Sequence, residues 1–414
     1  MTTIDSQSAA SNFDPRRYRP MPADLLLLFV AAQVFLWLSE CCGWFEFNEH
    51  KGYTVLVAVA VIAPLFPLVL LWLLVCWLFR WRLRFGVRGI VLLTVTLALP
   101  FGWLGISMVQ AWQQRNAVQY ARKSLGAHVE YDYEFDPARG RAAMPPGPPL
   151  LREWLGNDFF SRVDNVAFLR ATDEKLAHLT GMGRIRSLGI GGTEVAGPGL
   201  KYLRCLGLES LSHDGGVITD ETLEYVKGLR DLKHLHLTST KITDAGLEHL
   251  KWLHNLRRLE LVGAKITDDG LERFKSLPHL ERLSLSYNRI GDAGLQHLGQ
   301  LTQLQCLSLG MTKITSAGME HLKDLNQLRD LAVDGTQVDD DGLAHLRDLP
   351  RLEYLSVAYT QVTDAGLRQL EGSPQFKEIG LAGTKVTAEG VDRLRQALPH
   401  CKIWWAPPST KSER

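Results

Sequence analysis

The chain has 414 residues, of which 46% are hydrophobic and 22% are charged, and this composition excludes a disordered or collagen-like protein. Its formal net charge of +1 gives no electrostatic reason to expect nucleic-acid binding, and 6 cysteines are too few for a disulfide-built scaffold. The sequence changes character after residue 112, because long apolar runs give way to polar, leucine-rich sequence.

Three apolar stretches precede this change, at residues 23–39, 53–79 and 90–112. About 20 apolar residues in a helix cross the ~30 Å hydrocarbon core of a lipid bilayer. We therefore expect three transmembrane helices within residues 23–112, after a short tail at residues 1–22. A cleaved signal peptide is the alternative for the first stretch, and a buried core helix is the alternative for the other two.

The loops between these stretches predict an orientation. Residues 80–88 carry four arginines and no acidic residue, whereas residues 40–52 carry three glutamates and one lysine. Positive loops stay in the cytoplasm, so the N-terminus should be cytoplasmic and everything after residue 112 extracytoplasmic. The protein is then expected in the inner (plasma) membrane.

Residues 113–149 should connect this part to the rest of the chain. They read as a helix at 113–125, a strand-like run at 129–135 and a proline-rich spacer at 144–149. Residues 150–165, with Trp154, Phe159 and Phe160, are expected to cap the repeats that fill residues 166–405. Residues 401–405 should end the sheet, and residues 406–414 are a tail.

A 24-residue repeat dominates the second half. The phrase Ile-Thr-Asp-Ala-Gly-Leu at residues 242–247 returns in related form at 266, 290, 314, 338, 362 and 386, each time after an apolar L-x-x-L-x-L phrase. The alternating leucines predict a short strand with one buried face, and the Thr-Asp pair predicts a helix start. No repeat can bury its leucines alone, so the pattern predicts an α/β leucine-rich-repeat solenoid, or horseshoe.

Glycine fills the same helical position of the repeats, as in Gly246, Gly270 and Gly294. A glycine within a helix costs roughly 1 kcal/mol relative to alanine. We therefore expect a close approach of each helix to the sheet at this position.

The concave sheet of such a solenoid is the expected binding surface. Its outward-facing positions are basic in the earlier repeats and acidic in the later ones. We expect a protein partner on this face, and the alternative is an ordinary solvated sheet without a dedicated partner. The candidate partner-binding residues are His234, His236, Arg258, Glu260, Arg282, Asp330 and Tyr354.

No motif for catalysis, metal or a cofactor stands out, so neither an enzyme nor a cofactor is expected. Histidines recur on the outer helices, where solvated side chains are a simpler interpretation than a zinc ladder: His249, His297, His321 and His345. The neighbours His236 and Glu260 leave metal binding or acid–base chemistry as an alternative. Cys205, Cys306 and Cys401 lie about four repeats apart, roughly 20 Å at ~4.8 Å per strand, which is too far for disulfides.

The repeat resembles those of bacterial GALA-type proteins and of eukaryotic F-box leucine-rich-repeat proteins. The whole layout is similar to membrane-anchored leucine-rich-repeat proteins of planctomycete bacteria. The shared features are a Gln-Arg-x-Ala-Val helix at residues 114–118, Tyr-Asp-Tyr at 131–133 and Trp-Leu-Gly-x-Asp-Phe-Phe at 154–160. The three apolar segments depart from the one or two expected of that group. The resemblance implies an architecture rather than a reaction.

The sequence therefore predicts a membrane-anchored scaffold for protein–protein interaction. One alternative is an F-box-like substrate receptor for ubiquitin-ligase-type protein turnover with cytosolic repeats, although nothing before the repeats resembles an F-box. The other is a membrane enzyme that uses the proline-kinked apolar helices.

Overall fold

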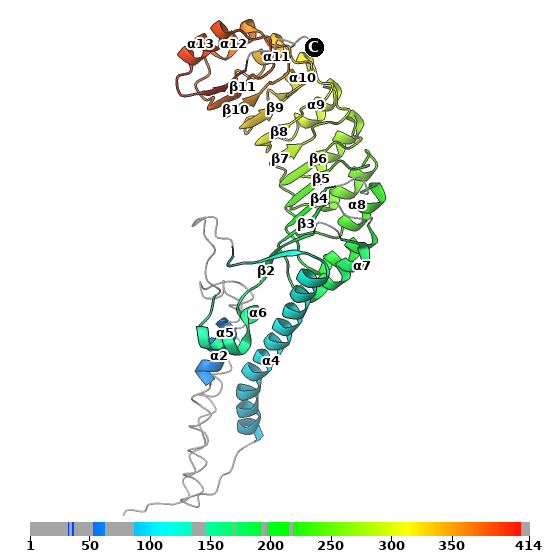
Figure 1. Ribbon diagram of the computed structural model, residues 1–414, viewed down its shortest axis with the longest axis vertical. Coiled ribbons are helices and arrows are strands. Elements are labelled where there is room, and N and C mark those ends of the chain that lie inside the picture. The colour runs from blue at the N-terminus through cyan, green and yellow to red at the C-terminus, as the bar shows by residue number, and fades with distance from the viewer. Residues whose placement is uncertain are drawn as a thin grey trace, which may run out of the picture. The chain divides into compact units, whose positions relative to one another are not determined.

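A computed structural model describes residues 32, 35–36, 53–62, 87–134, 146–168, 171–191, 195, 197–214 and 218–406 (Figure 1). The chain divides into two compact units. Residues 1–112 and 144–161 form the first, and residues 113–143 and 162–414 form the second. The domain boundaries expected from the sequence remain a prediction.

The first unit is helical in its described residues. It contains α2 (Tyr53–Ile62), α5 (Pro149–Leu155), α6 (Asn157–Phe160) and the first part of α4 (Val87–Ser124). Phe159 and Phe160, which we expected in a cap of the repeats, are buried here together with Ala111. Their two rings meet edge to face, with centroids 5.1 Å apart.

The expected membrane spans are only partly visible. Residues 90–112 are helical within α4, and residues 53–62 form α2, but residues 63–79 and nearly all of 23–39 lie outside the described residues. In the described part of the chain, no helix combines the length and the apolar character needed to cross a bilayer. The transmembrane region expected before the solenoid remains a prediction.

The second unit is built on a 12-stranded sheet whose strands follow one another in chain order within the described residues. β1 pairs antiparallel with β2, and the remaining neighbours pair in parallel. The strands are β1 (His128–Tyr131), β2 (Val163–Phe168), β3 (Ser187–Gly191), β4 (Ser210–Asp214), β5 (His234–Thr238), β6 (Arg258–Val262), β7 (Arg282–Ser284), β8 (Cys306–Ser308), β9 (Asp330–Ala332), β10 (Tyr354–Ser356), β11 (Glu378–Gly380) and β12 (Lys402–Trp404).

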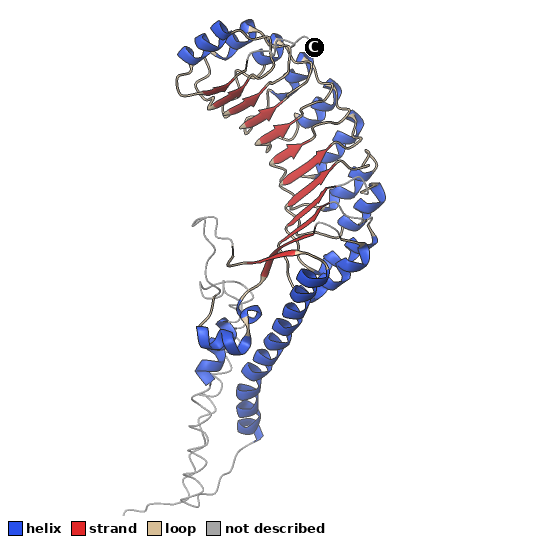
Figure 2. Cartoon of the chain, viewed as in Figure 1, coloured by secondary structure: helices blue, strands red, loops and turns tan. Residues whose placement is uncertain are grey.

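Short helices connect successive parallel strands and form a layer on one side of the sheet (Figure 2). Several are 3-10 helices of one to three turns rather than α-helices. They are α7 (Asp173–Leu176), η2 (Ala177–Met182), η3 (Pro198–Cys205), α8 (Asp220–Val226), η4 (Gly246–Trp252), η5 (Asp268–Ser276), α9 (Asp292–Leu298), α10 (Ser316–Met319), η6 (Glu320–Leu322), α11 (Asp340–Ala344), α12 (Asp364–Leu370) and α13 (Ala388–Ala397).

One continuous core runs between the strand and helix layers. Each repeat contributes the leucines of its L-x-x-L-x-L phrase, such as Leu235 and Leu237, and helix leucines such as Leu250, all of them buried. The end of α4 supplies Val118 and Ala121 to the same core, beside strand β1. The leucine pattern thus predicted the buried face of each repeat.

A carboxylate–threonine contact joins most neighbouring repeats. The Asp340 Oδ1 atom accepts a hydrogen bond from the Thr363 backbone N–H at 2.7 Å, and Oδ2 accepts one from the Thr363 hydroxyl at 2.6 Å. The same two bonds recur in four further joints: Asp220–Thr243, Asp244–Thr267, Asp292–Thr315 and Asp364–Thr387. In these five joints, each repeat therefore fixes the start of the next one.

The recurring glycine faces this joint rather than the sheet. A Cβ atom at Gly366 would fall well inside van der Waals contact of Asp340 Oδ1. The same holds at Gly246, against Asp220, and at Gly270, against Asp244. Our expectation of a close helix-to-sheet approach is wrong, because the space is taken by the aspartate of the preceding repeat.

Replacing the aspartate should weaken the stack. Asp340→Ala removes two hydrogen bonds to a charged acceptor and leaves the Thr363 N–H without its partner, so we expect a loss of about 2 kcal/mol in the free energy of unfolding. Asp341→Ala is the matched control, since it removes the same charge from the same turn of α11 without touching Thr363. Urea denaturation measures both. Equal losses in the two variants would contradict a role for the joint.

Candidate functional site

Two rows of side chains run across the strands on the face opposite the helices. The register aligns equivalent residues of neighbouring strands, so each row holds one residue per repeat. The first row is His234, Arg258, Arg282, Cys306, Asp330, Tyr354, Glu378 and Lys402. The second row is His236, Glu260, Ser284, Ser308, Ala332, Ser356, Gly380 and Trp404.

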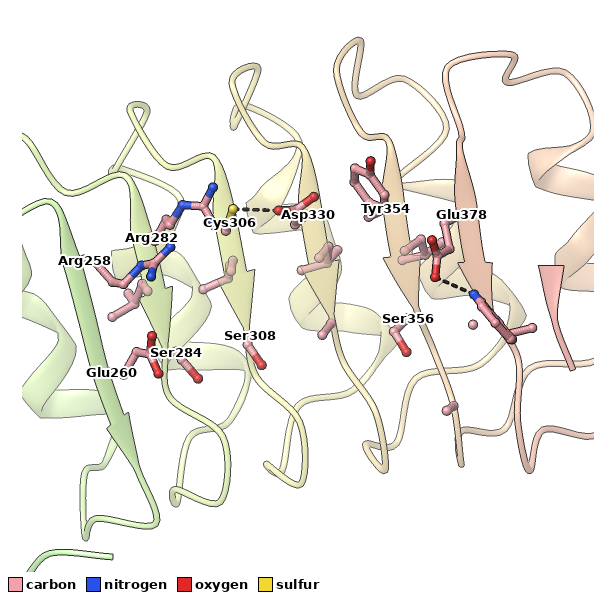
Figure 3. Close-up of a pocket in the computed structure, with 18 of the residues that line it drawn as sticks. Arg258, Glu260, Arg282, Ser284, Cys306, Ser308, Asp330, Tyr354, Ser356 and Glu378 are labelled. Carbon is pink, nitrogen blue, oxygen red and sulfur yellow. Dashed lines mark hydrogen bonds between the residues drawn. The ribbon is translucent and has the colours of Figure 1, made fainter. Parts of the chain in front are cut away.

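A hollow of about 610 Å³ opens between these rows, from β6 to β12. Its floor is formed by the small residues of the second row, from Ser284 to Gly380, which leave space that larger side chains would fill. The first row stands beside this floor, and Figure 3 shows Arg258 and Arg282 on one side and Tyr354 and Glu378 on the other. We call this hollow the concave groove.

Glu260 of the second row is held by His236, and the charges of the first row are divided along the concave groove. Arg258 and Arg282 lie on adjacent strands at its basic end, whereas Asp330 and Glu378 lie at its acidic end. Like charges on neighbouring strands repel each other unless a partner of opposite charge lies against them. The arrangement therefore favours a ligand that carries acidic and basic groups in the opposite order.

Aromatic side chains stand at the acidic end. Tyr354 is 42% exposed and Trp404 is 52% exposed, although both are large. The Trp404 indole N–H donates to Glu378, and the Lys402 ammonium lies 4.0 Å from the centroid of the Trp404 ring. Trp404 is thus held in place on one side and still presents a surface to a partner.

Cys306 lies at the middle of the first row. Its Sγ donates a hydrogen bond to Asp330 Oδ2 at 2.7 Å, as the dashed line in Figure 3 shows. Burial and the neighbouring Asp330 carboxylate raise the pKa of this thiol to about 12. The group is therefore a thiol and not a thiolate near neutral pH.

The two predicted histidines lie outside the concave groove. His236 bridges two carboxylates: its Nδ1 is 2.6 Å from Glu260 Oε2, and its Nε2 is 3.3 Å from Asp214 Oδ1. Through these two contacts, His236 links strands β4, β5 and β6. His234 has a lowered pKa because it is partly buried and lies beside Arg258.

The structure brings five of the seven predicted residues to the concave groove, namely Arg258, Glu260, Arg282, Asp330 and Tyr354. Cys306 and Glu378 occupy the outward-facing strand position expected from the sequence but were not among the candidate residues, and Trp404 was missed as a lining residue. Trp404 could have been found by counting 24 residues on from Gly380, because the period continues through the last strand. Whether these residues bind a partner remains a prediction.

The metal-binding alternative has no geometric support in the residues that the structure describes. Among them, no three His, Cys, Asp or Glu side chains gather in a way that could hold a metal ion. The three described cysteines, Cys205, Cys306 and Cys401, are free.

Comparison with known proteins identifies the repeats. Two family models described as leucine rich repeat match residues 228–251 and 254–314. No curated protein matches the chain.

Two solved structures from Listeria monocytogenes str. 4b F2365 are similar. An internalin C2 is 27% identical, with 46% of this chain and 77% of that chain covered and a TM-score of 0.37. An internalin, InlF, is 20% identical, with 59% and 82% covered and a TM-score of 0.37. Both TM-scores are too low to establish a shared overall fold. The family matches and the repeated strand–helix structure together show that the second unit contains a leucine-rich-repeat solenoid.

Proposed function

We propose that this protein is a non-catalytic scaffold that binds a protein partner in the concave groove. Leucine-rich repeats are protein–protein interaction scaffolds, and a solenoid presents a rigid, extended surface for that purpose. The observation that carries the proposal is the division of charge along the groove, with Arg258 and Arg282 at one end and Asp330 and Glu378 at the other.

The partner should place an extended segment across the strands. Arg282 and Glu378 are separated by four strand steps, or roughly 19 Å at ~4.8 Å per step. A fully extended chain covers that distance in about six residues at ~3.3 Å each. An acidic residue in such a segment would meet Arg282, and a basic residue about six positions away would meet Glu378.

Tyr354 and Trp404 suit the role of anchors. Aromatic side chains and arginines supply most of the binding energy at many protein interfaces, whereas their neighbours mainly exclude water. Here two exposed aromatic residues stand at one end of a small-residue floor, so they can pack against a partner without rearrangement.

We further propose that the first unit anchors the protein in a bilayer and that the repeats are extracytoplasmic. The support comes from the apolar stretches and from the arginine-rich loop at residues 80–88. Several large apolar side chains of α4 are also exposed, among them Phe101, Ile106, Val109 and Trp112. Exposed apolar side chains of this kind favour contact with an apolar environment.

Changing both ends of the concave groove should weaken partner binding. We expect Arg258→Glu with Tyr354→Ala to weaken the complex by at least about 2 kcal/mol, or roughly 30-fold in Kd, because it reverses one charge and removes one anchor. Copurification followed by titration of the recovered partner measures this. Arg230→Glu with Trp252→Ala is the matched control, since both side chains lie outside the groove. Unchanged affinity in the groove variant would contradict the proposal.

Cys306 should be a poor nucleophile. With a pKa of about 12, it should react with iodoacetamide at pH 8 far more slowly than the exposed Cys205, and its rate should rise with pH. Asp330→Asn removes the carboxylate that disfavours the thiolate, so it should lower this pKa and speed the reaction. Glu378→Gln is the control, because it should affect Cys401 instead. Rapid alkylation of Cys306 in the unmodified protein would favour a covalent role.

Protease protection tests the orientation. In spheroplasts that carry the chain with a tag after Arg414, external protease should remove the tag while a cytoplasmic marker stays intact. This result follows if the arginine-rich loop remains in the cytoplasm. A protected tag would place the repeats in the cytoplasm and favour the alternative role as a cytosolic substrate receptor.

A further inference from the structure

A second surface lies along the edge of the solenoid, just after each strand ends. Equivalent residues there form backbone hydrogen bonds from repeat to repeat: the N–H of Lys265 donates to Ile242 at 2.8 Å, and the N–H of Arg289 donates to Ile266 at 2.9 Å. These residues are therefore in register, about 4.8 Å apart. Four consecutive ones are basic, and we call them the basic edge: Lys241, Lys265, Arg289 and Lys313. The same position then holds Gln337 and Gln361.

The basic edge points outward. All four side chains are exposed, whereas the isoleucine that follows each of them in the sequence is fully buried. Successive residues of extended chain face opposite sides, so the cations share one face.

The four cations also have no counterion in the part of the chain that the structure describes. None of them makes an ion pair within 4.0 Å or a side-chain hydrogen bond there, while Lys227, Lys251 and Arg257 each pair with a glutamate. The nearby aspartates Asp220, Asp244 and Asp292 already accept hydrogen bonds from threonines of the next repeat. A row of unpaired like charges at strand spacing attracts an anionic ligand.

Large side chains beside the basic edge occupy a strained backbone position. Tyr287 has φ 63° and Met311 has φ 56°, two residues before Arg289 and Lys313 respectively. Ser239 and Tyr359 share this conformation at the equivalent position, and so do Gly263 and Gly335, where glycine adopts it without steric cost. Bulky residues are rare there, and their strain points to a role in recognition when packing does not account for them.

Packing does not account for Tyr287, because it is 61% exposed. Met311 is 45% exposed and lies against Gly335 of the next repeat, so it covers that glycine with an apolar surface. An aromatic ring and an apolar patch thus adjoin the cations.

We propose that the basic edge binds a linear acidic polysaccharide of the polyuronate class. Such a chain carries one carboxylate on each sugar ring, which suits one cation on each repeat. The apolar face of a sugar ring packs on an exposed aromatic ring such as Tyr287.

A row one side chain wide fits a linear polymer better than a bilayer, which binds broad basic clusters. A nucleic-acid strand would need several aromatic platforms, and of the residues two positions before the four cations, Ser239, Gly263, Tyr287 and Met311, one is aromatic. The site is separate from the concave groove and its protein partner.

The test uses the full-length chain and immobilised polygalacturonate. The variant Lys265→Gln, Arg289→Gln, Lys313→Gln introduces the residue that Gln337 and Gln361 already place at this position. We expect at least about tenfold weaker binding and a shallower dependence of affinity on salt, because fewer counterions are released. The control Lys227→Gln, Lys275→Gln, Lys323→Gln removes the same number of charges from the outer helices and should bind as the unmodified protein does.

Tyr287→Gly tests the aromatic contribution without threatening the fold, since glycine suits the local backbone. Its melting temperature should stay level or rise while its affinity for polygalacturonate falls. The proposal is overturned if the unmodified chain does not bind polygalacturonate, or if the triple variant binds as well as it does. It is also overturned if the control variant loses as much affinity, or if phosphatidylglycerol–phosphatidylcholine vesicles or single-stranded oligodeoxythymidylate bind more tightly.

Discussion

The joint between repeats governs the rest of the second unit. An aspartate such as Asp340 can bind both the backbone and the hydroxyl of Thr363 only when the two repeats stack at one height and in one register. The glycine of the later repeat, Gly366, leaves the space that the carboxylate needs. Aspartate, threonine and glycine therefore act as one unit. Burial of leucine drives the repeats together, but it tolerates small sliding movements, whereas two directed hydrogen bonds do not.

This fixed register produces both surfaces of the solenoid. In-register strands place equivalent residues side by side, so a property repeated at one position becomes a row. Small residues repeated at the second row of the concave face leave the hollow, and basic residues repeated at the edge form a row of cations that face the same way. Each surface depends on the same hydrogen-bonded joint, although neither contains it. Loss of the joint would therefore disturb the alignment of equivalent residues on both surfaces before it unfolded the chain.

Much of this could be predicted from the sequence. Leucine spacing gave the strands, the buried face and the order of the repeats, because periodicity follows directly from which side chains must leave water. The concave residues followed from the same count. The role of Asp340 could not be predicted in this way. The helix dipole already explains an aspartate at a helix start, and the residue that Asp340 binds lies 23 residues away. Likewise the strain at Tyr287 depends on a backbone angle, which a residue letter does not reveal. Sequence patterns indicate what is buried; they say less about which polar groups meet.

The constant period also fixes the distances between charged residues of the concave groove. Arg282 and Glu378 are separated by a whole number of identical steps, and duplication or loss of one 24-residue unit between them would change that distance by one step, ~4.8 Å, while leaving every joint intact. Descendants of such a gene could thus select longer or shorter partner segments by recombination alone, without passing through a misfolded intermediate. Point substitutions in the two rows would then adjust the side-chain chemistry that each repeat presents to the partner.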